Sequence, residues 1–164
     1  FKDKNKIYKE IHGGEQEFGR RGGTENVIGI ISFSIALQVS LERIDFENKK
    51  NNLLYNRLLD GLNSISKKII IPCQNSIKHS SITTIIFPGL KAESLIMGLD
   101  MEGVAVSSGA ACSSGKIGGS HVLNAMNYSH EQVIGAIRLS FGWDNNEDQV
   151  DFFLNVINNL LQGM

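Results

Sequence analysis

The sequence contains little cysteine, with only Cys73 and Cys112 among its 164 residues. The two lie too far apart to form a C-x-x-C pair, which excludes the usual spacing of zinc-finger and thioredoxin-type sites. We therefore expect no metal site. Reduced thiols of this kind are typical of a cytosolic protein.

The chain also lacks an excess of charge of either sign. Sixteen lysines and arginines stand against 17 aspartates and glutamates, which gives a net charge of -1. This balance excludes a nucleic-acid or membrane surface held by bulk charge, so an anionic ligand must be bound by particular residues. The opening ten residues lack the apolar core of a signal peptide, and we expect no apolar run long enough to span a bilayer. The expected location is cytoplasmic.

What the chain does have is enough apolar sequence for a real core. Its length suits one compact domain or a piece of a larger one, and 41% of its residues are hydrophobic. It begins at Phe1 without a methionine, and its first ten residues are typical of the end of a strand and its turn. We therefore expect a fragment of a longer protein.

A glycine-rich loop, IHGGEQEFGRRGGTENV, occupies residues 11 to 27 and leads into a helical pattern. Thr24 is the expected N-cap, and Gly22 and Gly23 allow a ligand to approach the free amides of the first turn. Arg20 and Arg21 add positive charge, which favours an anion site. An ordinary capped helix with solvated arginines explains the same pattern, and both interpretations stay open.

Hydrophobic periodicity predicts four longer helices and two short ones. The first begins at Val27 and is expected to be a core helix that is buried on most of its sides. A second helix follows from Phe46 to Ile65. The others cover residues 92 to 102, ended by Gly103, and the stretch after the cap Asn146; Ser120 and Ser129 cap the short ones. Strands are predicted at 69–71, 81–87, 104–106 and 136–142, with Cys73 taken as structural. This order describes an α/β or α+β layer sandwich.

Two stretches carry candidate chemistry. In AIRLSFG, residues 136 to 142, the alternation places Arg138 in mid-strand, where it is either a plain exposed arginine or a bidentate clamp for a carboxylate. In VAVSSGAACSSG, residues 104 to 115, Cys112 stands among residues too small to bury it. A surface loop with an incidental cysteine is the simple interpretation of that stretch, and a loop that carries a sulfur to chemistry elsewhere is the alternative.

Three stretches together resemble one enzyme family: GGEQEFGRRGGTENV, SSGAACSSGKIGGSHVL and AIRLSFG. Their content and order resemble the C-terminal part of cysteine desulfurases of the NifS/IscS type, which are class V, fold-type I enzymes dependent on pyridoxal 5'-phosphate (PLP). The resemblance implies an α/β fold with helices packed on a small, mostly antiparallel sheet. It also implies that residues 1–45 end the large cofactor domain and that 46–164 form the small C-terminal domain.

The resemblance assigns roles to three residues. Cys112 is implied as the nucleophile that takes sulfur from L-cysteine, leaves L-alanine and holds the sulfur as a persulfide for an acceptor such as an iron-sulfur scaffold. Arg138 is implied to bind the substrate carboxylate. Thr24 resembles the threonine that reaches the cofactor phosphate of the neighbouring subunit in a homodimer, while His121 is given no catalytic role.

The sequence departs from the family pattern in two places. Glu15 stands where many relatives have a third glycine, which reduces the freedom of that loop. The family's Ser-His-Lys stretch, which carries the lysine that binds PLP, does not occur, so we expect the chain alone to be inactive. Alternatives are a selenocysteine lyase and a non-enzymatic sulfur-carrier or interaction fragment.

Overall fold

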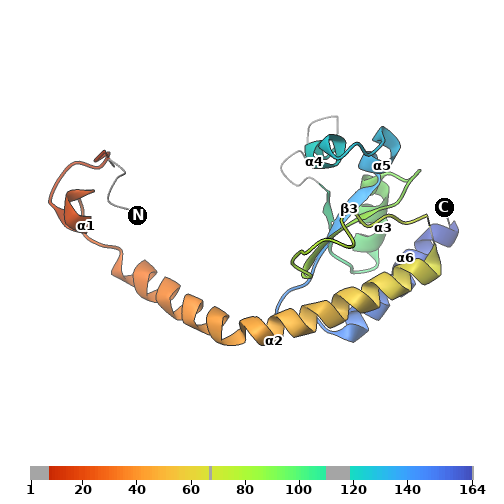
Figure 1. The fold of residues 1–164 in the computed structure, drawn as a ribbon, viewed down its shortest axis with the longest axis horizontal. Helices are drawn as coiled ribbons and strands as arrows, with labels where there is room; N and C mark the ends of the chain where they lie inside the picture. Colours follow the sequence, from red (N-terminus) through yellow and green to blue (C-terminus); the bar gives the residue numbers. More distant parts are fainter. Residues whose placement is uncertain (1–7, 67, 110–118, 164) are drawn as a thin grey trace. The chain divides into compact units, whose positions relative to one another are not determined.

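The computed structural model describes residues 8–66, 68–109 and 119–163, and the chain divides into two compact units, Phe1–Ile44 and Asp45–Met164. The elements of the first unit are helix α1 (Gln16–Gly19) and the beginning of helix α2 (Val27–Ile65). The second unit contains the rest of α2 and all other helices and strands (Figure 1). Each unit is described by itself.

The second unit is built on a three-stranded antiparallel sheet with the order β1-β3-β2. Its strands are β1 (Ile82–Ile86), β2 (Ser107–Ser108) and β3 (Ala136–Ser140). In register, Thr84 of β1 and Ser107 of β2 both lie opposite Arg138 of the central strand. The prediction of a small, mostly antiparallel sheet is confirmed.

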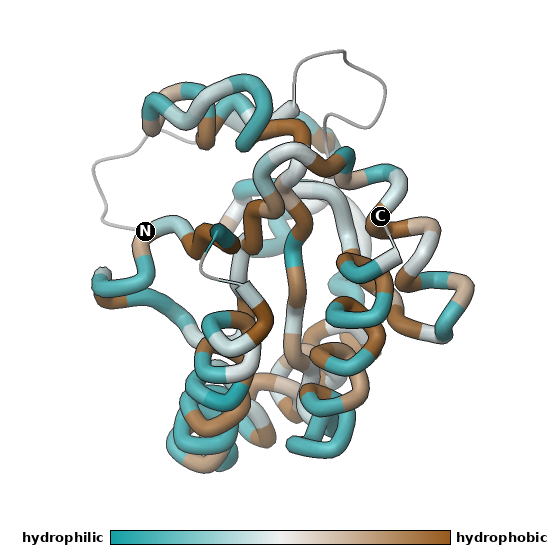
Figure 2. Tube along the Cα trace, turned by 90° about the vertical axis from the view of Figure 1, so that its right-hand side faces the viewer, coloured by the Kyte–Doolittle hydropathy of each residue, from teal (hydrophilic) through white to brown (hydrophobic). Residues whose placement is uncertain are grey.

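One face of this sheet forms the main core. Ile85, Ile137 and Leu139 pack there against α2, α3 (Ala92–Met101) and α6 (Glu147–Gly163), which contribute buried leucine, valine, isoleucine and phenylalanine side chains. The α2 residues in this core are Leu54, Leu58 and Leu62. Figure 2 shows apolar residues along the strands and along the helices around them. The alternation predicted for residues 136 to 142 is therefore confirmed.

The other face is covered in part by two short helices, α4 (His121–Ala125) and α5 (His130–Ile134). Leu123 and Val133 of these helices pack on Ile86 and Ala136 of the sheet. Both predicted caps form: the Leu123 amide donates to Ser120 Oγ (3.4 Å), and Ser129 makes a capping box with Gln132. These caps set where α4 and α5 begin.

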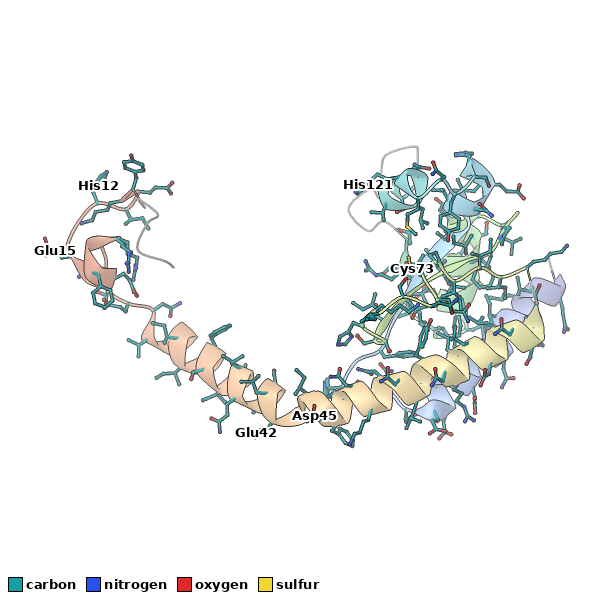
Figure 3. All side chains as sticks on the ribbon, in the orientation of Figure 1. His12, Glu15, Glu42, Asp45, Cys73 and His121 are labelled. Atoms are coloured by element: carbon teal, nitrogen blue, oxygen red, sulfur yellow. The ribbon has the colours of Figure 1, made fainter. Side chains whose placement is uncertain are left out.

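Several predicted elements differ from the structure. The two predicted helices at the start are one continuous α2, because the joining residues Leu41 to Phe46 contain neither glycine nor proline. The strand predicted at 69–71 is reduced to a single bridge between Ile70 and Ile86. The strand predicted at 104–106 lies later, at Ser107–Ser108. Cys73, for which a structural role was expected, is exposed and has φ +54° (Figure 3).

The first half of α2 also contradicts two expectations. Its apolar residues are exposed, so it is not a core element of this structure, and the buried α2 residues begin only at Asn51. By length and composition alone, α2 is long and apolar enough to cross a membrane, contrary to the expectation that no such run exists. The cap of α2 is Asn26, whose Oδ1 accepts from the Gly29 amide (3.0 Å), and not Thr24.

Candidate functional site

Arg138 lies at the middle of the central strand on the sheet face that α4 and α5 cover only in part. It is half-buried, and its register neighbours Thr84 and Ser107 point to the same face, since directly opposed residues of antiparallel strands share a side. Within the part of the chain that the structure describes, its guanidinium has no acidic partner. An arginine held on a rigid strand with its donors unused is suited to bind a carboxylate in a bidentate manner.

The segment that contains Cys112 is anchored next to Arg138. Strand β2 pairs with β3 at Ser107 and Ser108, and the Gly109 amide then donates to the Ala136 carbonyl (2.9 Å). A Cβ at Gly109 would lie 3.2 Å from that same oxygen, so glycine is what permits this close approach. Cys112 itself belongs to residues 110–118, outside the described residues.

The chain re-enters the described structure at Gly119 and Ser120. Gly119 has φ +67°, and a Cβ there would lie 2.5 Å from Cγ1 of Val133. Ser120 is buried and caps α4, whose first residue is the exposed His121 (Figure 3). Both ends of the cysteine segment are therefore fixed to the sheet and to its covering helices. Sequence reasoning named Ser107 and Gly109 only as small residues near Cys112, and it did not identify Thr84 or Gly119.

Thr24 is exposed in the loop that precedes α2. The guanidinium of Arg21 donates to the carbonyl oxygens of Gly22 (3.2 Å) and Thr24 (2.9 Å), so these donors support the loop rather than face a free ligand. The loop is closed tightly, because the Gly22 amide donates to the Ile11 carbonyl (2.7 Å) and a Cβ at Gly22 would lie 2.8 Å from the His12 oxygen. This geometry leaves the Thr24 side chain accessible to another molecule.

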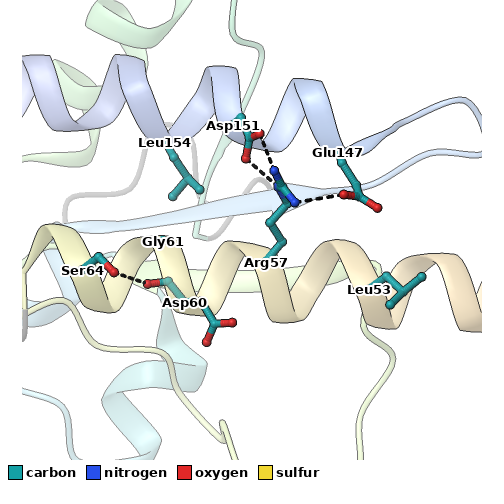
Figure 4. Close-up of a pocket in the computed structure, with 8 residues that line it drawn as sticks. All are labelled: Leu53, Arg57, Asp60, Gly61, Ser64, Glu147, Asp151 and Leu154. Atoms are coloured by element: carbon teal, nitrogen blue, oxygen red, sulfur yellow. Dashed lines mark hydrogen bonds and ion pairs between the residues drawn. The ribbon is translucent and has the colours of Figure 1, made fainter.

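A groove of about 460 Å³ lies between α2 and α6, and Figure 4 shows that its centre is an ion-pair network. Arg57 donates to both carboxylate oxygens of Asp151 (2.6 Å each) and to Glu147 (2.9 Å). The hydrogen bond from Arg57 holds the pKa of Asp151 below its ordinary value. These ion pairs link α2 to α6. Because Arg57 is already paired with two carboxylates, the groove is not a candidate anion site.

Metal chemistry has no candidate site in residues 8–66, 68–109 and 119–163. No group of three or more His, Cys, Asp or Glu side chains is placed there to hold an ion. The candidate functional site is therefore the sheet face around Arg138, together with the anchored ends of the cysteine segment.

The chain is similar to known proteins of one family. The family model "Aminotransferase class-V" matches residues 2–153. "Cysteine desulfurase IscS" of Clostridium botulinum (strain Hall) is 35% identical over 159 residues, which are 96% of this chain and 40% of that protein. "Putative cysteine desulfurase IscS 1" of Bacillus subtilis (strain 168) is 38% identical over 148 residues, 88% of this chain and 38% of that protein.

Solved structures give the same result. A NifS-like protein from Rickettsia africae aligns over 96% of this chain and 41% of its own, with TM-score 0.81 and 27% identity. A second structure titled "NIFS-LIKE PROTEIN" aligns over 99% of this chain and 41% of its own, with TM-score 0.83 and 30% identity. The chain thus spans about 40% of the length of the curated relatives it matches.

Proposed function

Because the chain belongs to the aminotransferase class-V family, we propose that it is part of a cytoplasmic cysteine desulfurase, which removes sulfur from L-cysteine and leaves L-alanine. Relatives with that name match nearly the whole chain. The observation that carries the proposal is the position of Arg138, unpaired among the described residues and beside the strand that leads directly to the Cys112 segment.

Arg138 is proposed to bind the carboxylate of the substrate. Two parallel N–H···O bonds from one guanidinium fix both the position and the orientation of a carboxylate. The hydroxyl groups of Thr84 and Ser107, opposite Arg138 in register, are the polar groups next to this site. When the substrate is held by its carboxylate, its sulfur atom remains free to react with the nucleophile.

Cys112 is proposed as that nucleophile. Three peptide units separate it from Gly109, and three peptide units span at most about 11 Å. Its thiolate forms an S–S bond with the substrate sulfur while the Cβ–S bond breaks. The substrate carbon takes up the electron pair and a proton to become the methyl group of alanine. A thiolate of a sulfur-acceptor protein then attacks the outer sulfur of the persulfide, and the Cys112 thiolate leaves.

Pyridoxal 5'-phosphate is the cofactor that the family implies, and when bound it supplies the electron sink for C–S cleavage. The residues of this chain fit an outer contact with it: Thr24 is exposed on a tightly closed glycine loop and can donate to a phosphate oxygen. We propose that Thr24 makes this contact across a homodimer. We further propose that the lysine that carries the cofactor lies outside these residues, because no Ser-His-Lys stretch occurs here.

The test uses a chimera in which this chain replaces the matched part of the C. botulinum relative. The chimera should release alanine from L-cysteine, and Cys112→Ala should abolish the persulfide detected by mass spectrometry. Cys73→Ala is the matched control, because Cys73 is the other cysteine and lies on an exposed turn. Persulfide formation that survives Cys112→Ala, or depends on Cys73, would overturn the assignment of the nucleophile.

The carboxylate clamp has its own test in the same chimera. Arg138→Ala should raise the apparent KM for L-cysteine about 100-fold, because a charge-assisted bidentate contact is lost. Lys49→Ala removes the same charge from an exposed position of α2 outside the proposed sites and should leave KM unchanged. An unaltered KM in Arg138→Ala would show that this side chain only faces solvent.

A further inference from the structure

A polar cavity of the second unit lies between α2 and the segment that leads into β1. Its volume is about 400 Å³, and it is lined by Asn48, Asn51, Asn52, Lys78, His79 and Ser80. All of these side chains are polar and none is acidic. The lining contains neither Arg138 nor the ends of the cysteine segment, so the cavity has no part in the proposed desulfuration. Such a lining suits a small polar anion rather than an apolar ligand.

Asn51 forms the floor of this cavity and supplies an acceptor that the described residues leave unused. It is 6% exposed, and its Oδ1 has no hydrogen-bond partner among them. Asn48 and Asn52, on the same face of α2, are exposed and lie at the rim. A buried carbonyl oxygen without a partner is destabilising, and nearly all such groups in proteins are paired. Asn51 therefore points to a ligand that donates a hydrogen bond.

Lys78 supplies a positive charge to the cavity. It is half-buried, and its Nζ lies 4.6 Å from the centre of the Tyr55 ring. In the described part of the chain, no carboxylate pairs with this ammonium group. An aromatic face holds a cation without neutralising its charge. The charge of Lys78 is therefore available to an anion.

Two neutral side chains add N–H donors. Ser80 Oγ donates to Asn52 Oδ1, and the amide N–H groups of Asn52 have no partner in the ranges that the structure describes. The Ser81 amide donates to Nδ1 of His79 (3.4 Å), so this nitrogen is an acceptor and a neutral His79 carries its proton on Nε2. The cavity thus combines one cation, several N–H donors and one buried acceptor.

We infer that this cavity binds a phosphate group that brings a hydroxyl donor with it, either as hydrogen phosphate or as the phosphate ester of a small polyol. The phosphoryl oxygens accept from Lys78, His79 and the Asn52 amide. The hydroxyl donates to Asn51 Oδ1. Sulfate has a similar shape and charge but carries no proton at neutral pH, so it leaves Asn51 without a partner. The site is therefore expected to prefer phosphate.

Isothermal titration calorimetry of the 164-residue chain tests this preference with sodium phosphate, sodium sulfate and glycerol 3-phosphate at neutral pH. Phosphate or glycerol 3-phosphate should bind about 10-fold more tightly than sulfate, because only these two supply a donor to Asn51. The tighter of the two identifies the ligand as the free anion or as an ester. Equal binding of all three, or binding of none at millimolar concentration, would overturn the inference and leave water as the partner of Asn51.

Substitutions place the anion in this cavity. Lys78→Gln should weaken phosphate binding about 10-fold, because a charge-assisted contact is lost. Lys91→Gln is the matched control, since Lys91 is an exposed lysine of the same unit outside the cavity, and it should leave the affinity unchanged. Asn51→Leu removes the acceptor at similar volume, so phosphate and sulfate should then bind equally. If Asn51→Leu does not fold, Lys78→Gln and the ratio of phosphate to sulfate affinity decide the question.

Arg138 is the other place where an anion is proposed to bind, so it provides a second control. Arg138→Ala should leave phosphate binding unchanged. Loss of phosphate binding in Arg138→Ala, with retention in Lys78→Gln, would place the anion at the proposed substrate site and overturn this inference. Failure of the chimera to release alanine would count against the proposed function alone, because these titrations do not depend on desulfuration.

Discussion

At the scale of single residues, Gly135 fixes the start of the strand that carries Arg138. A Cβ at this buried position would lie 2.2 Å from the Phe87 carbonyl oxygen and 2.9 Å from that of Leu90. Both are backbone atoms, so neither can move aside as a flexible side chain does. Gly135→Ala should therefore lower the free energy of unfolding by about 3 kcal/mol, measured by urea denaturation.

The control for this substitution is Gly163→Ala. Gly163 ends α6 and has nothing within 4 Å of a built Cβ, so the free energy of unfolding should stay within about 0.5 kcal/mol. If both variants lose a similar amount of unfolding free energy, the clash of the new methyl group at position 135 is not the cause of the loss. In the chimera, Gly135→Ala should also weaken L-cysteine binding, because Arg138 follows three residues later on β3.

The ion pair between Arg57 and Asp151 gives a prediction for pH. The hydrogen bond from Arg57 lowers the pKa of Asp151 in the folded chain below its ordinary value of 3.8. The pair therefore adds stability above pH 3.8, and this contribution is lost as the pH falls through the lower, folded-state pKa. Asp151→Asn should lower the Tm slightly at pH 7 and by less at pH 2, and both effects are small because the two side chains are partly exposed. An equal loss of Tm at both pH values would contradict this.

Sequence reasoning at this scale succeeded where the signal is local. The caps Ser120, Ser129 and Asn146 were predictable because a cap needs only its own side chain and an amide two or three residues later. Thr24 was assigned the cap that Asn26 makes, since both residue types suit the position and only the backbone decides where the helix begins. The roles of Gly109 and Gly135 depend on residues distant in sequence and were not predictable.

At the scale of elements, α5 is the short helix that leads into β3, and its capping box holds it. The Gln132 amide donates to Ser129 Oγ (3.3 Å), and the Ser129 amide donates to Gln132 Oε1 (2.9 Å). Ser129→Ala should lower the free energy of unfolding by about 1 kcal/mol, because the Gln132 amide loses its acceptor, Ser129 Oγ. Thermal unfolding by calorimetry measures this, and Ser76→Ala on an exposed turn is the control.

Strands β1 and β3 and helices α3 to α6 were predictable because each has a buried and an exposed face. The alternation of β3 and the spacing of Val150, Phe153 and Ile157 in α6 record which side meets the core. The strand predicted at 69–71 failed for the opposite reason: three β-branched residues show propensity, but pairing with a neighbour reaches only Ile70. The sequence correctly indicated that the helix beginning at Val27 is apolar around most of its circumference. It could not show that these side chains are exposed in this structure.

At the scale of the whole molecule, the two units differ in what holds them. Every member of both hydrophobic clusters lies between Leu54 and Ile157, within the second unit. The main ion-pair network, Arg57 with Asp151 and Glu147, also belongs to it. The first unit has no comparable cluster among its described residues.

This division predicts that residues 45–164 fold without the first 44. Expressed alone, they should unfold cooperatively with a Tm within about 3 °C of the full chain, because the buried side chains that set the transition are all retained. Leu58→Ala, which empties a fully buried position, should lower the free energy of unfolding by about 3 kcal/mol in both proteins. If the shortened chain shows no cooperative transition, residues 8–44 are needed to stabilise the second unit. The loss of unfolding free energy caused by Leu58→Ala would then differ between the two proteins.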